Sequence, residues 1–355
     1  MQMRKQNFHF PIVLSAAAMF AMIIDSKTSF SGASEGLELC MNVVIPSLYP
    51  FMVLSMIITS FTSNFQIRFL RRIANWLHLS PQGFQIYLIS LLGGYPVGAQ
   101  CICQAYQAGT IDKSEAERML TFSNNAGPAF IFGIGLRILG RPWMCWAVWI
   151  IHILASTITA ILTPGSQSYL SAKENPIPLS SSSSIIQKSV AVMATVCGWI
   201  ILFRIILSFL QRWILWILPR NWSILFAGLL ELANGSINLE ELPSSADRLI
   251  LFSFILGFGG ICVLLQTKSV LSSSKLNFCN YFPGKLTHAA VSFLLSLPVA
   301  SLLCENLVYS NYFIPALGAM ALCICYRISF LINKKRIAFS YQSLYNGKKI
   351  WRYSR

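Results

Sequence analysis

The chain has 355 residues, of which 55% are hydrophobic and only 11% charged. Soluble domains carry roughly 25% charged residues, and the mean hydropathy of +0.60 refers to the whole chain, not to one anchor. These values exclude a soluble enzyme with a membrane tail, a disordered chain and a nucleic-acid-binding domain. The net charge of +15 therefore reports mainly on membrane topology, because Lys and Arg must lie outside the hydrocarbon.

The residues that usually carry chemistry form no catalytic or metal-binding motif. The ten cysteines lie mostly within apolar runs, and the four histidines are scattered along the chain. The sequence has no Walker motif, no HExxH and no pair of intramembrane carboxylates. We therefore predict that the protein is not an enzyme and has no catalytic residue, metal or cofactor.

The apolar segments predict an all-α polytopic membrane protein with about eight transmembrane helices. The first, residues 11–24, follows Arg4 and Lys5, and a cleaved signal peptide is the alternative interpretation of this segment. The other crossings are expected at residues 37–61, 119–139, 143–163, 189–210, 249–266, 288–303 and 312–332.

The apolar stretch 84–106 cannot form one regular helix. Its centre, residues 93–98, holds three glycines and a proline in six residues. At membrane depth, irregular backbone is tolerated only inside protein or beside a wet cavity. The simplest structure is a re-entrant hairpin, in which two short helices meet at a broken tip and return to the same side.

A second re-entrant hairpin is expected around residues 222–235. Its apolar part ends at Glu231 and is shorter than the roughly 20 residues that a crossing needs. Two of the predicted crossings also contain helix-breaking interruptions, at residues 123–128 and 257–260. The sequence therefore predicts four breaks at membrane depth.

An internal repeat relates the two halves of the chain, although chance similarity between apolar helices is the alternative. A serine- and proline-rich linker separates the halves. Residues 116–127 and 246–257 match without a gap at Ala116/Ala246, Arg118/Arg248, Phe122/Phe252, Ser123/Ser253 and Gly127/Gly257. The predicted organisation is an N-terminal transmembrane helix and loop (1–36), a first repeat (37–163), a linker (164–188), a second repeat (189–303), and a last transmembrane helix with a basic cytoplasmic tail (304–355).

The basic residues predict the orientation in the cell membrane. With a cytoplasmic N-terminus and two re-entrant stretches, seven of the 27 Lys and Arg residues face outside and 20 face inside, as the positive-inside rule requires. Both termini are then cytoplasmic, and the two repeats run in opposite senses. Inverted repeats with broken helices near the midplane are typical of secondary transporters.

Four motifs follow one another along the chain: GYPVGA at 94–99, FSNNAGPAF at 122–130, ELANG at 231–235, and GFGGICV at 257–263 with Gln266. Together they resemble the nucleoside-recognition (Gate) domain membrane proteins, most closely their sporulation integral membrane branch. The resemblance covers roughly residues 37–310. It implies a transporter-like fold related to concentrative nucleoside carriers, a role in spore formation, and movement of dipicolinate, a small aromatic dicarboxylate.

The motif residues are the candidate site. Half-helix N-termini at broken tips favour carboxylates or phosphates. Glu231 would repel an anion, so it is assigned to a coupling proton or cation. A purely structural role is the alternative for each residue. The predicted substrate-binding residues are Gly94, Pro96, Gly98, Asn124, Asn125, Gly127, Asn234, Gly259, Gly260 and Gln266.

Three functions stay open at this point. The first is a carrier for a small anion such as dipicolinate, and the second is a nucleoside or nucleobase carrier with contacts such as Tyr95 and Phe258. The third is a structural membrane component of spore assembly. The expected partners are a small-molecule substrate and the lipid bilayer, not nucleic acid. The sequence leaves the coupling ion, transport direction and oligomeric state open.

Overall fold

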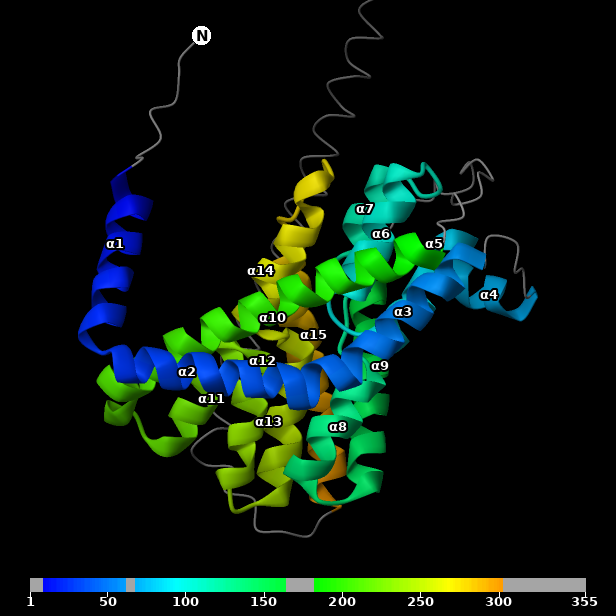
Figure 1. Ribbon diagram of the computed structural model, residues 1–355. Coiled ribbons are helices and arrows are strands. Elements are labelled where there is room, and N and C mark those ends of the chain that lie inside the picture. Colours follow the sequence, from blue (N-terminus) through cyan, green and yellow to red (C-terminus); the bar gives the residue numbers. More distant parts are fainter. Residues whose placement is uncertain (1–8, 62–67, 164–181, 303–355) are drawn as a thin grey trace, which may run out of the picture.

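The structure is a computed structural model, which describes residues 9–61, 68–163 and 182–302. Every regular element in these ranges is a helix (Figure 1). The fold is therefore an all-α polytopic membrane protein, as predicted. The predicted crossing at 312–332 and the basic tail lie outside the described residues. Four described stretches are long and apolar enough to cross a membrane: Ser26–Ile58, Pro142–Leu162, Ile185–Trp213 and Ser245–Val270.

The N-terminal helices form a long arm along the molecule. Asp25 ends the first helix and caps the second, because its carboxylate accepts a hydrogen bond from the Thr28 amide at 3.2 Å. The predicted crossing at 37–61 covers only part of this arm. The arm begins earlier in the chain, but polar residues lower the hydropathy of that earlier part, so it was not recognised as part of a long helix. The arm consists of α1 (His9–Ile24), α2 (Ser26–Leu39), a π-helical turn (Cys40–Val44) and α3 (Ile45–Phe61).

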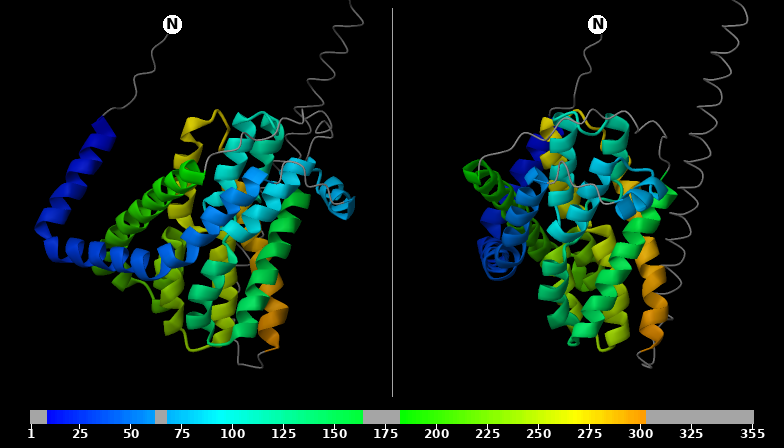
Figure 2. Two further views of the ribbon diagram at one scale, coloured as in Figure 1. Left: turned by 45° about the vertical axis from the view of Figure 1, so that its right-hand side comes forward. Right: turned by 90° about the vertical axis from the view of Figure 1, so that its right-hand side faces the viewer.

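Helix α10 (Ser182–Trp213) packs along α2. The right-hand view of Figure 2 shows both helices on the side of the molecule opposite α9 (Pro142–Leu162) and α15 (Tyr281–Ser301). A glycine permits the close approach, because a Cβ atom at Gly36 would lie 2.9 Å from the Cα of Ile201. The first turns of α10 lie within the predicted linker.

Both predicted hairpins form helix–break–helix units. Local signals explain the first, since Ser80 caps it with a hydrogen bond from the Gly83 amide at 3.0 Å and Pro81 occupies its first turn. Figure 1 shows α6 beside α7 at the upper end, with α11 and α12 lower down. The bounds are α5 (Pro81–Gly93) and α6 (Val97–Gln107), then α11 (Arg220–Leu230) and α12 (Leu232–Ile237).

Two broken crossings follow the hairpins. The first consists of α7 (Lys113–Met119) and α8 (Pro128–Leu139), and the second of α13 (Ser245–Phe258) and α14 (Gly260–Val270). In Figure 1, α7 leads down to α8, whereas α13 leads up to α14. The two crossings therefore run in opposite directions, as inverted repeats require. Superposition of the two repeats stays a prediction.

Matched residues of the repeat have matched roles. Arg118 donates to the carbonyl oxygen of Ala160 at 2.9 Å, at the end of α9, and Arg248 donates to that of Ile138 at 3.1 Å, at the end of α8. Each arginine thereby donates to a carbonyl in the last turn of a helix, where the regular intrahelical hydrogen bonds end. Phe122 is fully buried, as is its counterpart Phe252.

One local prediction needs correction. Helix α15 begins at Tyr281 and not at 288, which places Lys285 inside a helix where it is 1% exposed. The topology prediction counts this lysine among the inside basic residues, but a residue buried in protein carries no topological information. The remaining elements are α4 (Arg68–Trp76) and the 3-10 turns Leu215–Ile217, Asn238–Glu241 and Leu271–Ser273.

A buried cavity where four helix breaks meet

The first hairpin tip contacts both broken crossings. A Cβ atom at Gly94 would lie 3.2 Å from the amide nitrogen of Gly127, in the break between α7 and α8. A Cβ atom at Gly259 would lie 3.1 Å from the hydroxyl oxygen of Tyr95. Three breaks that are distant in sequence therefore touch in the interior.

The second hairpin tip joins them through Gly260. This residue and Gly259 adopt positive φ values of 82° and 84°, which glycine accommodates without steric cost. A Cβ atom at Gly260 would lie 3.3 Å from the amide nitrogen of Leu232 and 3.4 Å from the carbonyl oxygen of Leu230. All four breaks thus form one contiguous region.

The breaks enclose a cavity of about 30 Å³. By volume it holds one or two water molecules, so a larger solute requires the surrounding helices to separate. Its polar groups come from Tyr95, Glu231 and Gln266, and Gly127 contributes backbone. The apolar lining comes from Val44, Leu48, Ala126, Phe130, Val196, Ile200, Leu232, Ala233 and Val263.

A helix begins directly after each break. The first amides of a helix lack intrahelical acceptors and carry a partial positive charge. Side chains cap two of these four starts: Glu231 caps α12, and Asn124 Oδ1 accepts from the Ala99 amide of α6 at 3.3 Å. Helices α8 and α14 begin without a side-chain cap. The starts of α8 and α14 therefore present helix amides without a side-chain acceptor, while the carboxylate of Glu231 lines the same cavity.

Glu231 is buried and fully hydrogen bonded. Its Oε1 accepts from the Ala233 amide at 3.1 Å, and its Oε2 accepts from the amide and the Nδ2 of Asn234, both at 2.6 Å. The carboxylate thus caps α12 while it also lines the cavity. A role in ion coupling stays a prediction for this residue.

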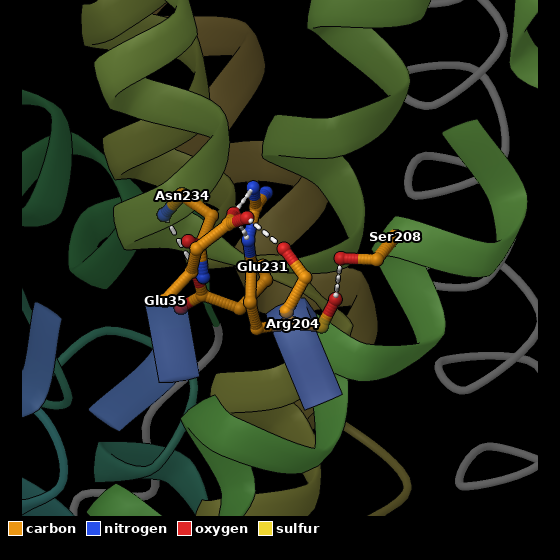
Figure 3. Close-up of polar contacts among 6 residues, drawn as sticks. Glu35, Arg204, Ser208, Glu231 and Asn234 are labelled. Atoms are coloured by element: carbon orange, nitrogen blue, oxygen red, sulfur yellow. Dashed lines mark hydrogen bonds and ion pairs between the residues drawn. The ribbon is translucent and has the colours of Figure 1, made fainter. Parts of the chain in front are cut away.

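A larger cavity, here called the outer vestibule, lies on the other side of Asn234. It measures about 270 Å³ and is lined by Glu35, Arg137, Arg204 and Asn234 among others. Arg204 forms an ion pair with Glu35, close to Glu231 and Asn234 (Figure 3). Asn234 lines the vestibule and also holds Glu231, so it separates the two cavities.

The predicted site residues have different surroundings. Gly127, Glu231 and Gln266 line the cavity. Gly98 allows a close approach of backbones, because a Cβ atom there would lie 2.0 Å from the carbonyl oxygen of Ser123. Three further predicted residues form the breaks themselves: Gly94, Gly259 and Gly260. Pro96 directly precedes the first residue of α6.

The two adjacent asparagines hold the fold together. Asn124 Nδ2 donates to Thr267 Oγ1 at 2.8 Å and to the Tyr281 hydroxyl at 2.9 Å. Asn125 Nδ2 donates to the carbonyl oxygen of Phe122 at 2.7 Å. Neither residue belongs to the cavity lining. These hydrogen bonds engage both Nδ2 groups within the protein, whereas the buried Oδ1 of Asn125 has no hydrogen-bond partner among the described residues.

Sequence reasoning missed a buried lysine next to the cavity. Lys285 Nζ lies 2.7 Å from the Tyr95 hydroxyl, 3.1 Å from the Asn124 carbonyl oxygen and 3.3 Å from His288 Nδ1. None of the ion pairs found among the described residues includes this lysine. The sequence pattern that could have identified this lysine is its spacing from His288, because residues three apart lie on one helix face.

Two histidines complete the polar cluster. The rings of His152 and His288 stack with centroids 4.5 Å apart, and His152 Nε2 accepts from the Ala126 amide at 3.1 Å. His152 is therefore a buried histidine with one hydrogen-bonded ring nitrogen, while its Nδ1 has no hydrogen-bond partner among the described residues. Within the described ranges, no group of three or more His, Cys, Asp or Glu side chains is placed to hold a metal ion.

The fold and the cavity define a helical integral membrane protein with discontinuous helices around a buried polar centre. The chain is similar to the sporulation integral membrane protein YlbJ of Bacillus subtilis (strain 168), with 26% identity over 324 residues that cover 77% of this chain and 79% of that protein. This similarity over most of both chains supports a YlbJ-like membrane protein. No family model and no solved structure matches the chain, so the resemblance to Gate domain proteins stays a prediction.

Proposed function

We propose that this protein is a carrier that moves a small anion across the membrane during spore formation, and that dipicolinate is the anion. The meeting of four helix breaks around one buried cavity carries this proposal. Irregular backbone in lipid costs several kcal/mol for each unsatisfied polar group, as an order of magnitude. Breaks gathered around one polar centre share water and solute as hydrogen-bond partners, which is the usual arrangement in carriers.

Two helix starts and Lys285 favour an anion over a nucleoside, whereas the Glu231 carboxylate in the lining opposes an anion. Helices α8 and α14 begin beside it without a side-chain cap, and Lys285 lies behind Tyr95. A nucleoside site would use amide side chains, yet the Nδ2 donors of Asn124 and Asn125 are engaged within the protein, which leaves Asn125 Oδ1 as a buried amide oxygen without a partner among the described residues. Gln266 is the amide that lines the cavity.

The relative supports the biological setting. The protein from Bacillus subtilis is named for sporulation and for its place in the membrane. A structural role in spore assembly is the competing function. It would tolerate changes that keep the fold and fill the cavity, whereas a carrier would not.

Uptake into liposomes tests the proposal. The purified full chain should take up labelled dipicolinate, and an excess of nucleosides should not compete. Gly127→Ala should block uptake, because its Cβ would lie 2.9 Å from the amide nitrogen of Gly94. Gly133→Ala is the matched control on the same helix, since nothing lies within 4 Å of the new methyl group. Nucleoside uptake without dipicolinate uptake would indicate the second carrier function, and uptake of neither would favour the structural role.

A further inference from the structure

We infer that Lys285 is the cation that binds a carboxylate of the transported anion, and that Tyr95 covers this lysine until the anion enters. The inference rests on the proposed carrier function and adds a residue to its site. It names the substrate class as organic anions with an accessible carboxylate.

The protonated Lys285 would have hydrogen-bond acceptors but no acidic partner among the described residues. An ammonium group has three donors, and Lys285 has three neutral acceptors, the Tyr95 hydroxyl, the Asn124 carbonyl and His288 Nδ1. A buried charge without an opposite charge is costly. The arginines of the outer vestibule, by contrast, have acid partners. An ionisable residue inside a membrane protein is a functional candidate by default.

The histidines do not supply the missing negative charge. His288 Nδ1 accepts from Lys285, so its proton belongs on Nε2, which lies 3.2 Å from the His152 carbonyl oxygen. His152 Nε2 accepts from the Ala126 amide, which places its proton on Nδ1. Both rings are then neutral, so neither histidine supplies a negative charge to Lys285.

Tyr95 lies between Lys285 and the cavity. The phenol lines the cavity, and its hydroxyl accepts from Lys285 at 2.7 Å and donates to the Leu256 carbonyl oxygen at 3.1 Å. The ammonium nitrogen lies 4.9 Å from the ring centroid. A carboxylate that displaces the hydroxyl would take over its hydrogen bond from Lys285 and add charge neutralisation. A second carboxylate would remain in the cavity, near the uncapped starts of α8 and α14.

The test measures anion binding by thermal shift of the purified full chain in detergent. The probes are dipicolinate, benzoate, inorganic phosphate, and the neutral analogue pyridine-2,6-dicarboxamide. The variants are Lys285→Gln and a matched control, Lys268→Gln, at an exposed lysine of α14. A purely structural lysine would change the unfolding temperature of the free protein, but not its discrimination between dipicolinate and the neutral analogue.

We expect dipicolinate to stabilise the wild type and the control more than the dicarboxamide does. The affinity of Lys285→Gln for dipicolinate should fall by at least about tenfold, the usual scale for a lost charge-assisted hydrogen bond. Its affinity for the dicarboxamide should stay unchanged. Equal dipicolinate affinity in Lys285→Gln and wild type would overturn the inference. So would the absence of any anion-dependent shift in the wild type.

Tyr95→Phe keeps the test decisive if Lys285→Gln does not fold. This change removes the hydroxyl that competes for Lys285, so anion affinity should rise. Unchanged or weaker binding would refute the covering role of Tyr95. If wild-type liposomes take up no dipicolinate but benzoate or phosphate binds through Lys285, the proposed substrate fails and this inference stands. If uptake is intact in Lys285→Gln, the inference fails and the proposed function stands.

Discussion

Glu231→Gln separates the helix-capping role of Glu231 from its proposed role as a coupling residue. The carboxylate accepts three hydrogen bonds, two at Oε2 from Asn234 and one at Oε1 from the Ala233 amide. Glutamine has one oxygen, which can keep both bonds from Asn234. Its NH₂ group then faces the Ala233 amide, donor against donor. A buried donor without an acceptor costs about 1–3 kcal/mol, so the unfolding temperature should fall measurably.

The transport readout of Glu231→Gln decides the coupling role. The assay measures uptake into liposomes across a range of pH and of Na⁺ and K⁺ gradients. Glu231→Gln should lose the ion dependence of uptake more than it loses affinity for the anion. Asp112→Asn is a matched control, because Asp112 also caps a helix, accepting from the Glu115 amide at 2.7 Å, but lies outside both cavities. Wild-type ion and pH dependence in Glu231→Gln would show that Glu231 is only a cap.

Three further predictions concern packing and topology. Gly36→Leu should destabilise the protein by roughly 1–3 kcal/mol, because α2 meets α10 there. Gly198→Leu should not, since nothing lies within 4 Å of its new Cβ. Equal thermal unfolding of the two variants would contradict this packing. Arg204→Glu should be destabilising and Glu35→Arg should rescue it by about 0.2–1 kcal/mol in a double-mutant cycle; zero coupling would mean that the pair makes no energetic contact. A cysteine at Lys113, in a chain with Cys279 replaced, should react with an impermeant maleimide only from the cytoplasmic side; labelling in sealed cells would reverse the orientation.

The breaks were predictable because their cause is local. Gly94, Gly259 and Gly260 have positive φ values, and glycine in an apolar stretch indicates such positions directly. The polar partners were not predictable, because they come from distant segments. Asn124 bonds Thr267 and Tyr281, and no local pattern joins residues so far apart in sequence.

The hydropathy pattern also failed to place two charged residues, Lys285 and Glu35, inside helices. A window that ends a crossing at the first charged residue excludes Lys285 from α15, although the helix continues to Tyr281. The same reasoning hid α2, whose Glu35 lines the outer vestibule. Charged residues inside membrane helices lower the hydropathy signal where function concentrates.

The second hairpin shows how this protein holds a carboxylate. Glu231 places both oxygens on the first amides of α12, and the Nδ2 of Asn234 adds a third donor. The starts of α8 and α14 lie at the same cavity without a side-chain cap. A substrate carboxylate can bind there as Glu231 binds to α12, because both use backbone amides and the helix dipole. Glu231 opposes such an anion by charge repulsion, whereas Lys285 attracts it. Protonation of Glu231, or a cation beside it, would therefore strengthen anion binding, which is a physical route from ion binding to transport.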